Sequence, residues 1–304
     1  MARTIAVVGA TGLIGRALSR ALVARGDTVL AVSRRGSAHI EGARDVAWNP
    51  ADGPPPPEVI DGVEAVVNMA GSPIASGRWT AARKRQIRDS RVTATRLLAE
   101  RIGGGGAPSV LVNSSAVGYY GTRHGDAEID EATPPGDDFL AQVGVAWERA
   151  ADPAVQRGAR VVLVRTGLVL DGDDGILPRL AMLSRLMIGG PVGGGEQWMP
   201  WIHIDDEVAV LMRALDDPDM SGPVNATAPR PARQREFMDA LGRVLGRPSF
   251  MPTPAFPLRL GMGEMSTLLL DGQRAVPGVL RERGFTFAYP ELEPALRAAL
   301  GRPA

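Results

Sequence analysis

A short apolar run followed by spaced glycines opens the chain and limits what it can fold into. Thr4–Val8 is rich in β-branched residues, which is typical of a buried parallel strand. The next residues follow the pattern G-x-T-G-x-x-G, which comprises Gly9, Thr11, Gly12 and Gly15. Apolar residues then recur at helical spacing over residues 13–23. A strand, a glycine turn and a helix in this order predict a dinucleotide-binding site.

Each glycine of this turn has a separate expected role. Gly9 permits the tight turn, Gly12 lets the backbone approach a pyrophosphate, and Gly15 packs the helix against the strand. Leu13 and Ile14 begin the helix, where unpaired amide groups bind phosphate oxygens, so we count both among the cofactor-binding residues. Glycines also occur in ordinary strand-to-helix turns, but the strand and helix on either side favour the cofactor site.

The end of the second expected strand indicates which dinucleotide binds. Thr28–Val32 is apolar and leads into Ser33, Arg34 and Arg35. An acidic residue at this point would bind the ribose hydroxyl of NAD, whereas arginines accommodate the additional phosphate of NADP. The alternative is a solvated basic turn. We therefore predict NADP(H) as the cofactor.

Further apolar runs alternate with amphipathic segments along the first half of the chain. We expect strands at Val46–Trp48, Val63–Met69, Ser109–Val112 and Arg160–Val164, and helices at Trp79–Ile102 and Asp137–Ala151. This alternation predicts an α/β fold with a doubly wound parallel sheet. Met69, Ala70 and Gly71 would let the cofactor lie close to the backbone, although an ordinary strand-to-loop turn has the same composition.

The pattern changes after Arg165. Glycine-rich loops follow at 171–175 and 189–195, and prolines are frequent between Pro223 and Pro257. We expect residues 1–165 to form the dinucleotide-binding domain and residues 166–304 a smaller mixed α/β lobe on the substrate side, packed together as one compact unit. Ligands of such folds lie outside the carboxyl ends of the strands.

Composition excludes several classes of function. The 34 basic residues balance the 34 acidic ones, and there is no cysteine. We therefore expect no nucleic-acid partner, no membrane partner, no disulfide and no thiol catalysis, and a cytoplasmic location. His39 and His124 lie in polar segments, and no cluster has the spacing of zinc ligands, so we expect no metal. The sequence does not indicate an oligomeric state.

Several motifs together resemble one protein superfamily. They are the glycine turn, NSSAVGYYG at 113–121, WIHIDD at 201–206, the segments 78–92 and 139–148, and the tail 241–300. Over nearly its whole length the chain resembles the extended short-chain dehydrogenase/reductase superfamily, within the subgroup of NAD(P)-dependent epimerase-like proteins that have a characteristic C-terminal region. The resemblance implies a Rossmann-like fold.

The superfamily's catalytic residues do not carry over completely. The resemblance implies a serine, a tyrosine that exchanges a proton, and a lysine four residues after the tyrosine that lowers its pKa. Lys84 is the only lysine, and the residue four positions before it is Thr80. On the helix where the pair should lie, Phe139 precedes Val143 and Leu140 precedes Gly144 by four positions.

Other polar groups are candidates for the chemistry. Ser115 stands where the superfamily serine belongs, and Tyr119 and Tyr120 follow it, so we predict these three as catalytic. Ser114 is expected beside the cofactor. The alternatives are hydroxyls that cap a turn and tyrosines that pack in the core.

Four further residues in and just before the WIHIDD motif are considered as candidates. Trp198 and Trp201, with Gln197, would either form a stacking wall for substrate or fill the core. For His203 a structural hydrogen bond is favoured over catalysis.

Two functions remain open. One is an NADP(H)-dependent oxidoreductase or epimerase-like enzyme that acts on a small carbonyl, hydroxyl or sugar-like substrate without the usual tyrosine–lysine pair. The other is a weakly active or inactive NADP(H)-binding module that senses redox state. The absent pair favours the sensor, whereas the retained hydroxyls and the elaborate C-terminal lobe favour the enzyme.

Overall fold

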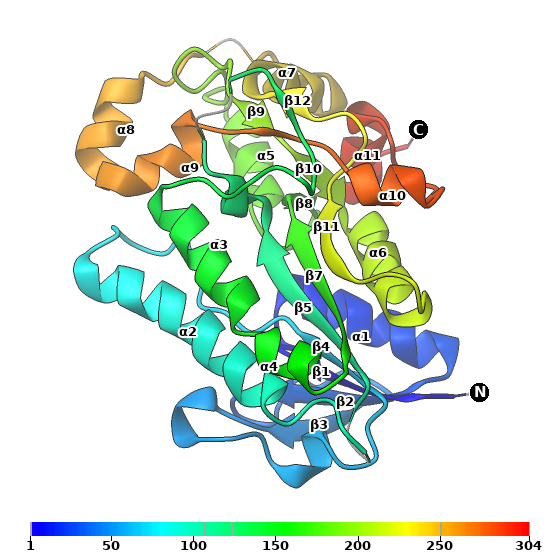
Figure 1. Cartoon of the computed structure of the whole chain (residues 1–304). Coiled ribbons are helices and arrows are strands. Elements are labelled where there is room, and N and C mark those ends of the chain that lie inside the picture. The colour runs from blue at the N-terminus through cyan, green and yellow to red at the C-terminus, as the bar shows by residue number, and fades with distance from the viewer. Residues whose placement is uncertain (1, 106–107, 123–124, 250, 304) are drawn as a thin grey trace.

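A parallel sheet runs through the centre of the computed structural model, which describes residues 2–105, 108–122, 125–249 and 251–303. Among these residues seven strands form the sheet, in the order β11-β7-β5-β4-β1-β2-β3 (Figure 1). Every neighbouring pair is parallel. The strands are β1 Thr4–Val8, β2 Thr28–Ser33, β3 Arg44–Ala47, β4 Ala65–Asn68, β5 Val110–Ala116, β7 Arg160–Thr166 and β11 Gly222–Ala226. The predicted fold class is confirmed.

Helices cover both faces of this sheet. α1 (Leu13–Arg25) and α6 (Ile204–Asp216) lie on one face, and α2 (Ala81–Ala99) and α3 (Phe139–Arg149) lie on the other (Figure 1). The strands are apolar on both faces and supply two separate cores, one around Leu18 and Leu22 of α1 and one around Leu98 of α2. Such two-sided burial explains why the strands show continuous apolar runs in the sequence.

The strands β4 and β5 differ from their predicted bounds. β4 is shorter than the expected Val63–Met69, and β5 continues past Val112 to Ala116. The extension exists because β5 stays paired with β7, so that Ser115 lies opposite Arg165 and Ala116 opposite Thr166. Asn113, Ser114 and Ser115 therefore belong to a buried strand.

The chain returns to the main sheet after residue 165. β11 pairs with β7 along its whole length, and α6 packs beside α1. The sequence offered no sign of β11, because Gly222 and Pro223 occupy its first positions and only a few apolar residues follow. The division of the chain into two domains at residue 165 stays a prediction. β11 and α6 follow that residue but pack against the first part of the chain.

The remaining elements form a lobe above the carboxyl ends of the strands (Figure 1). Its short sheets pair β8 with β10, β9 with β12, and β6 with β13. Their bounds are β6 Glu128–Ile129, β8 Leu168–Leu170, β9 Trp198–Met199, β10 Trp201–His203, β12 Ala232–Arg233 and β13 Arg274–Ala275. A third core around Trp201 and Phe237 holds this lobe together.

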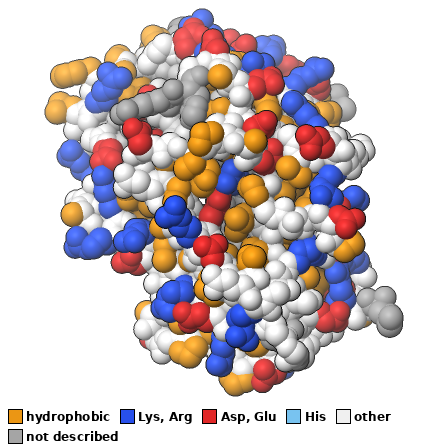
Figure 2. Space-filling model, viewed as in Figure 1, with side chains coloured by type: hydrophobic (Ala, Val, Ile, Leu, Met, Phe, Trp, Pro, Cys, Tyr) orange, Lys and Arg blue, Asp and Glu red, His pale blue; other side chains and the backbone are white. Residues whose placement is uncertain are grey.

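Short helices complete the lobe and the connections. They are α4 Asp152–Gln156, α5 Leu177–Arg185, α7 Gln234–Leu245, α8 Ala255–Met262, α9 Thr267–Leu270, α10 Gly278–Glu282 and α11 Leu292–Ala299, with 3-10 turns η1 Pro50–Asp52, η2 Pro57–Val59, η3 Val117–Tyr120 and η4 Gly263–Ser266. Across the described part of the chain, no helix has the length and apolar character needed to cross a membrane. Figure 2 shows apolar side chains gathered around a hollow in the middle of one face.

Candidate functional site

The glycine turn between β1 and α1 has the geometry that its sequence predicts. Gly9 has a φ of 84°, and a Cβ added there would lie 2.8 Å from the carbonyl oxygen of Met69. A Cβ on Gly15 would overlap the carbonyl oxygen of Gly9, so helix and turn are in backbone contact. Gly12 caps α1, and a Cβ there would meet only the Gly9 oxygen, at 3.4 Å. The space beside Gly12 is therefore open to a ligand.

A cavity of about 570 Å³ extends from this turn across the carboxyl ends of β1, β2 and β4. Of the predicted cofactor residues it is lined by Gly9, Thr11, Gly12, Ser33, Arg34, Met69, Ala70 and Gly71. The cavity also reaches Trp48, Asn49 and Arg83, which sequence reasoning missed because nothing in the sequence places the β3 loop and α2 beside the glycine turn. Its position at the β1/β4 switch point of the sheet is where such folds bind dinucleotides.

The other predicted cofactor residues lie next to this cavity rather than in its wall. They are Leu13, Ile14, Gly15, Arg35 and Ser114. Gly15 acts through its backbone contact, and Leu13 and Ile14 pack against the core beneath α1. Arg35 is exposed, and Ser114 is buried in β5.

Two adjacent arginines follow β2. Arg34 and Arg35 are both exposed, and neither has an ion pair with another described residue. Ser33 is buried, and its hydroxyl accepts a hydrogen bond from the Ser37 amide at 3.2 Å. Unpaired guanidinium groups beside an open cavity fit an anionic group such as a ribose phosphate.

A second cavity of about 620 Å³ lies beyond the carboxyl ends of β5 and β7. Ala116 and Thr166, which are opposite each other in the two strands, form its floor. The two cavities lie close together at one segment, where Pro73 lines the first and its neighbour Ile74 lines the second.

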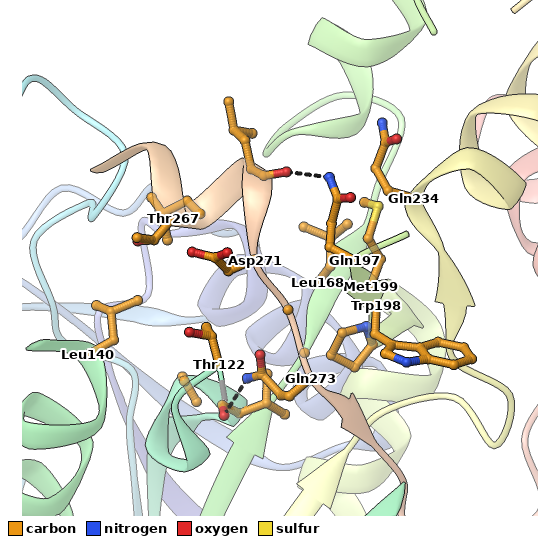
Figure 3. Close-up of a pocket in the computed structure, with 18 of the residues that line it drawn as sticks. Thr122, Leu140, Leu168, Gln197, Trp198, Met199, Gln234, Thr267, Asp271 and Gln273 are labelled. Atoms are coloured by element: carbon orange, nitrogen blue, oxygen red, sulfur yellow. Dashed lines mark hydrogen bonds between the residues drawn. The ribbon is translucent and has the colours of Figure 1, made fainter. Parts of the chain in front are cut away.

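The walls of the second cavity come from both halves of the chain (Figure 3). Leu140 from α3 and Thr122 after η3 lie on one side, Asp271 follows α9, and Trp198 belongs to β9. The amide of Gln197, also in the wall, donates to the carbonyl oxygen of Leu269 at 2.6 Å. Trp198 and Gln197 thus face a pocket, as one of the two alternatives for them predicted.

Trp201 has the opposite role. Its side chain is fully buried, and its indole donates a hydrogen bond to the carbonyl oxygen of Arg230 at 3.1 Å. It fills the third core, which was the other alternative open for these tryptophans.

The three side chains predicted to be catalytic do not line the second cavity. The Ser115 hydroxyl donates to Glu148 at 2.7 Å, and Glu148 forms a two-point ion pair with Arg165, with both N–O distances at 2.8 Å. Arg165 also donates to the Tyr120 hydroxyl, which in turn donates to Asn225 at 2.7 Å. This buried network holds the hydroxyls of Ser115 and Tyr120 in structural hydrogen bonds, and the catalytic role expected for these two residues stays a prediction.

The two tyrosines differ in their surroundings. Tyr120 is fully buried, and burial raises the pKa of its phenol to about 12, which makes it a poor proton donor at neutral pH. Tyr119 is half-buried, and the Arg165 guanidinium carbon lies 3.6 Å from its ring centroid. No described residue forms a hydrogen bond with the Tyr119 hydroxyl.

The four positions on α3 where a tyrosine–lysine pair would lie have different surroundings. Phe139 and Leu140 line the second cavity, whereas Val143 is buried. Gly144 contacts Tyr119, since a Cβ there would lie 3.1 Å from the Tyr119 Cα. Lys84 lies outside this helix, pairs with Glu264, and rests over the Phe139 ring.

His203 has a structural position, as the sequence favoured. It precedes α6, its Nδ1 accepts from the Asp205 amide at 3.2 Å, and its ring stacks 4.0 Å from that of Tyr289. Burial lowers its pKa. Within the described residues no group of three or more His, Cys, Asp or Glu side chains could hold a metal ion. His124 lies outside those residues.

A buried carboxyl group lies behind the second cavity. The Thr166 hydroxyl, which is part of the cavity wall, bonds with Oε1 of Glu207 at 2.8 Å. Glu207 is fully buried on α6, and its other oxygen has no partner among the described residues. Burial without a cation raises the pKa of Glu207 to about 8. Nothing in the sequence indicates that, of three consecutive acidic residues, Asp205 would be exposed while Asp206 and Glu207 would be buried.

The family of the chain follows from sequence comparison. The model described as the NAD dependent epimerase/dehydratase family matches residues 5–226. The chain belongs to this family. A second model, described as a domain of unknown function (DUF1731), matches residues 253–299. These matches confirm the subgroup with a characteristic C-terminal region that the motifs indicated.

Relatives share nearly the full length of the chain. Epimerase family protein Mb2239 of Mycobacterium bovis is 43% identical over 300 residues, which cover 98% of each chain. The crystal structure of human epimerase family protein SDR39U1 (isoform 2) with NADPH is 34% identical to this chain and has a TM-score of 0.87. The match covers 98% of this chain and 99% of the human one. A Corynebacterium glutamicum structure described as a nucleoside-diphosphate sugar epimerase is 34% identical and has a TM-score of 0.82. The match covers 99% of this chain and 59% of that longer chain.

Gly12 and Gly15 make a matched pair of tests for the glycine turn. Gly12→Val should leave the fold intact, because the position is extended with φ −75° and open, and should weaken NADPH binding at least about tenfold by blocking the pyrophosphate. Gly15→Ala should instead destabilise the protein by roughly 1–3 kcal/mol through overlap with the Gly9 backbone. Calorimetric titration and thermal denaturation of both variants measure the two effects. Unchanged NADPH affinity in Gly12→Val would contradict the site.

Glu207 should make stability depend on pH. Its pKa is raised in the folded state, so folding is favoured while the group is protonated, and this contribution is lost as pH rises from about 4.3 to about 8. In that range the free energy of unfolding should fall by roughly 1.4 kcal/mol per pH unit relative to Glu207→Gln. Chemical denaturation of both proteins across this pH range provides the measurement. Parallel pH profiles for the two proteins would show that Glu207 is not buried in this way.

Proposed function

We propose that the protein is an NADP(H)-dependent oxidoreductase or epimerase-like enzyme that acts on a small carbonyl or hydroxyl compound. The observation that carries the proposal is the second cavity, which lies close to the first at the same edge of the sheet. A redox sensor needs a place for the dinucleotide, but it has no need of a further pocket of about 620 Å³. That volume is in the range of ordinary small-molecule sites.

The first cavity fits the dinucleotide. Backbone at Gly9 and Gly12 would receive the pyrophosphate at the amino end of α1, and Gly71 would allow close approach from β4. Arg34, unpaired at the cavity wall, would hold the additional phosphate of NADP. The NADPH present in the human relative supports the same choice.

The chemistry must proceed without the tyrosine–lysine pair. When bound, the reduced cofactor supplies the hydride that adds to a carbonyl carbon and is itself oxidised, while a proton from the protein or solvent completes the alcohol. Of the three tyrosine and serine candidates, Tyr119 alone keeps a hydroxyl outside the buried network, and its neighbours Val117 and Gly118 line the second cavity. We therefore retain Tyr119 as the candidate donor. No lysine is near it to promote proton transfer, so turnover should be slow.

The redox sensor remains the alternative. Its support is the absence of the tyrosine–lysine pair, together with apolar residues at both positions where the tyrosine would stand. The two functions share the dinucleotide site and differ in what the second cavity holds. Tight NADPH binding with no consumption of NADPH by any carbonyl compound would favour the sensor.

Arg34 and Arg35 allow a test of cofactor choice. Arg34 lines the first cavity and Arg35 does not, so Arg34→Ala should weaken NADPH binding by about 10- to 100-fold and leave NADH binding nearly unchanged. Arg35→Ala should have a smaller effect and serves as the matched control. Titration of both cofactors into each variant gives the ratio of affinities. If neither substitution changes that ratio, the second strand does not select NADP.

A panel of carbonyl compounds tests turnover and the donor. Wild-type protein should consume NADPH slowly with at least one of them, and Tyr119→Phe should lower that rate by about 100-fold or more, as loss of a general acid does. Tyr120→Phe and Ser115→Ala should act chiefly on thermal stability, because their hydroxyls belong to the buried network. Full activity of Tyr119→Phe would leave solvent as the proton source.

A further inference from the structure

The charged side chains in the described wall of the second cavity are all acidic. Among the described residues that line it, none is a lysine or an arginine. Its acidic members are Asp138, Glu264 and Asp271. Most of the remaining wall is apolar, and it includes Phe139, Leu140, Leu168, Trp198, Met199 and Leu268.

Three described cations near this cavity already have carboxylate partners. Lys84 pairs with Glu264. Arg233 and Arg274 lie against the Trp198 ring, where Arg233 pairs with Asp126 at 2.6 Å and Arg274 with Glu128 at 3.0 Å.

Two further cations near the cavity are no better placed to bind an anionic ligand in it. Arg165, below the floor, is held by Glu148. Arg78 is exposed beside Gly263 and is not part of the wall.

The backbone amides at the amino end of α3 do not take the place of the missing cations. The amino end of this helix borders the cavity, and a helix amino end can bind phosphate through its free amides. Here Asp138 is the capping residue, and its carboxylate accepts from the Ala141 amide at 2.9 Å. The negative charge at this point opposes a second anion.

We infer that the second cavity takes an apolar carbonyl compound that is uncharged or cationic, and that it rejects nucleoside diphosphate sugars. A diphosphate brings two or more negative charges that need arginine, lysine or free helix amides, and the wall supplies acidic and apolar groups in their place. The inference rests on the proposed function, since it treats this cavity as the substrate site. It separates this chain from the nucleoside-diphosphate sugar activity in the description of the Corynebacterium glutamicum relative.

A charge series on one scaffold tests this inference by binding. Wild-type protein is first saturated with NADPH, and loading is verified separately. Acetophenone, its para-carboxylate, its para-aminomethyl derivative and UDP-glucose are then titrated by calorimetry. The neutral and cationic ketones should bind at least about tenfold more tightly than the carboxylate, and UDP-glucose should bind no better than the carboxylate.

Two substitutions identify the cavity as the source of the discrimination. Asp271→Asn removes an exposed acidic group from the wall and should narrow the difference between neutral and anionic ketones severalfold. Asp239→Asn removes an exposed acidic group on α7, outside this wall, and should leave the difference unchanged.

The results that would overturn the inference are distinct from a failure of the proposed function. Tighter binding of UDP-glucose than of the neutral ketone, a preference for the carboxylate, equal effects of the two substitutions, or no binding of any ketone would each overturn it. Because the readout is equilibrium binding, absent turnover does not affect the result. A failure of the cofactor site would appear earlier, in the NADPH loading step.

Discussion

The buried ion pair between Glu148 and Arg165 organises the polar ends of the central strands. It ties α3 to β7, and through Ser115 and Tyr120 it reaches β5 and η3. Removing one partner of such a pair leaves an uncompensated buried charge, which costs roughly 3–5 kcal/mol. The network therefore requires hydroxyls at the end of β5 for structure, and those are the positions that the sequence alone suggests for chemistry.

The same network limits which side chains fit on the face of α3 that packs against Tyr119. The Arg165 guanidinium lies against the Tyr119 ring, and Tyr119 in turn packs against Gly144. A lysine at position 144 would bring its Cβ within 3.1 Å of the Tyr119 backbone, closer than such contacts normally are. At positions 140 and 144, therefore, packing disfavours a tyrosine–lysine pair, because Tyr119 would have to move.

How far the sequence predicts this molecule depends on the range of the interactions involved. The turn at Gly9 and the strand Thr4–Val8 are set by local backbone geometry, so both their positions and their roles could be predicted. The role of Ser115 could not, because it depends on Glu148 and Arg165, which are 33 and 50 positions away along the chain and carry no local signature. The second cavity is hidden for the same reason, since its walls come from segments that meet only after β11 joins the sheet.

The two cavities divide the charge of the site between them. Below the first, Arg91 packs beneath Gly71, where burial and the nearby Arg83 lower its pKa to about 10, so it stays cationic at neutral pH. With Arg34 at the opposite wall, this side attracts the phosphates of a dinucleotide. The second cavity has three acidic residues and no cation in its described wall, although Glu264 is paired with Lys84, so the anionic end of a dinucleotide is favoured in the first. The charges of the two walls thus fit a dinucleotide whose phosphates bind in the first cavity.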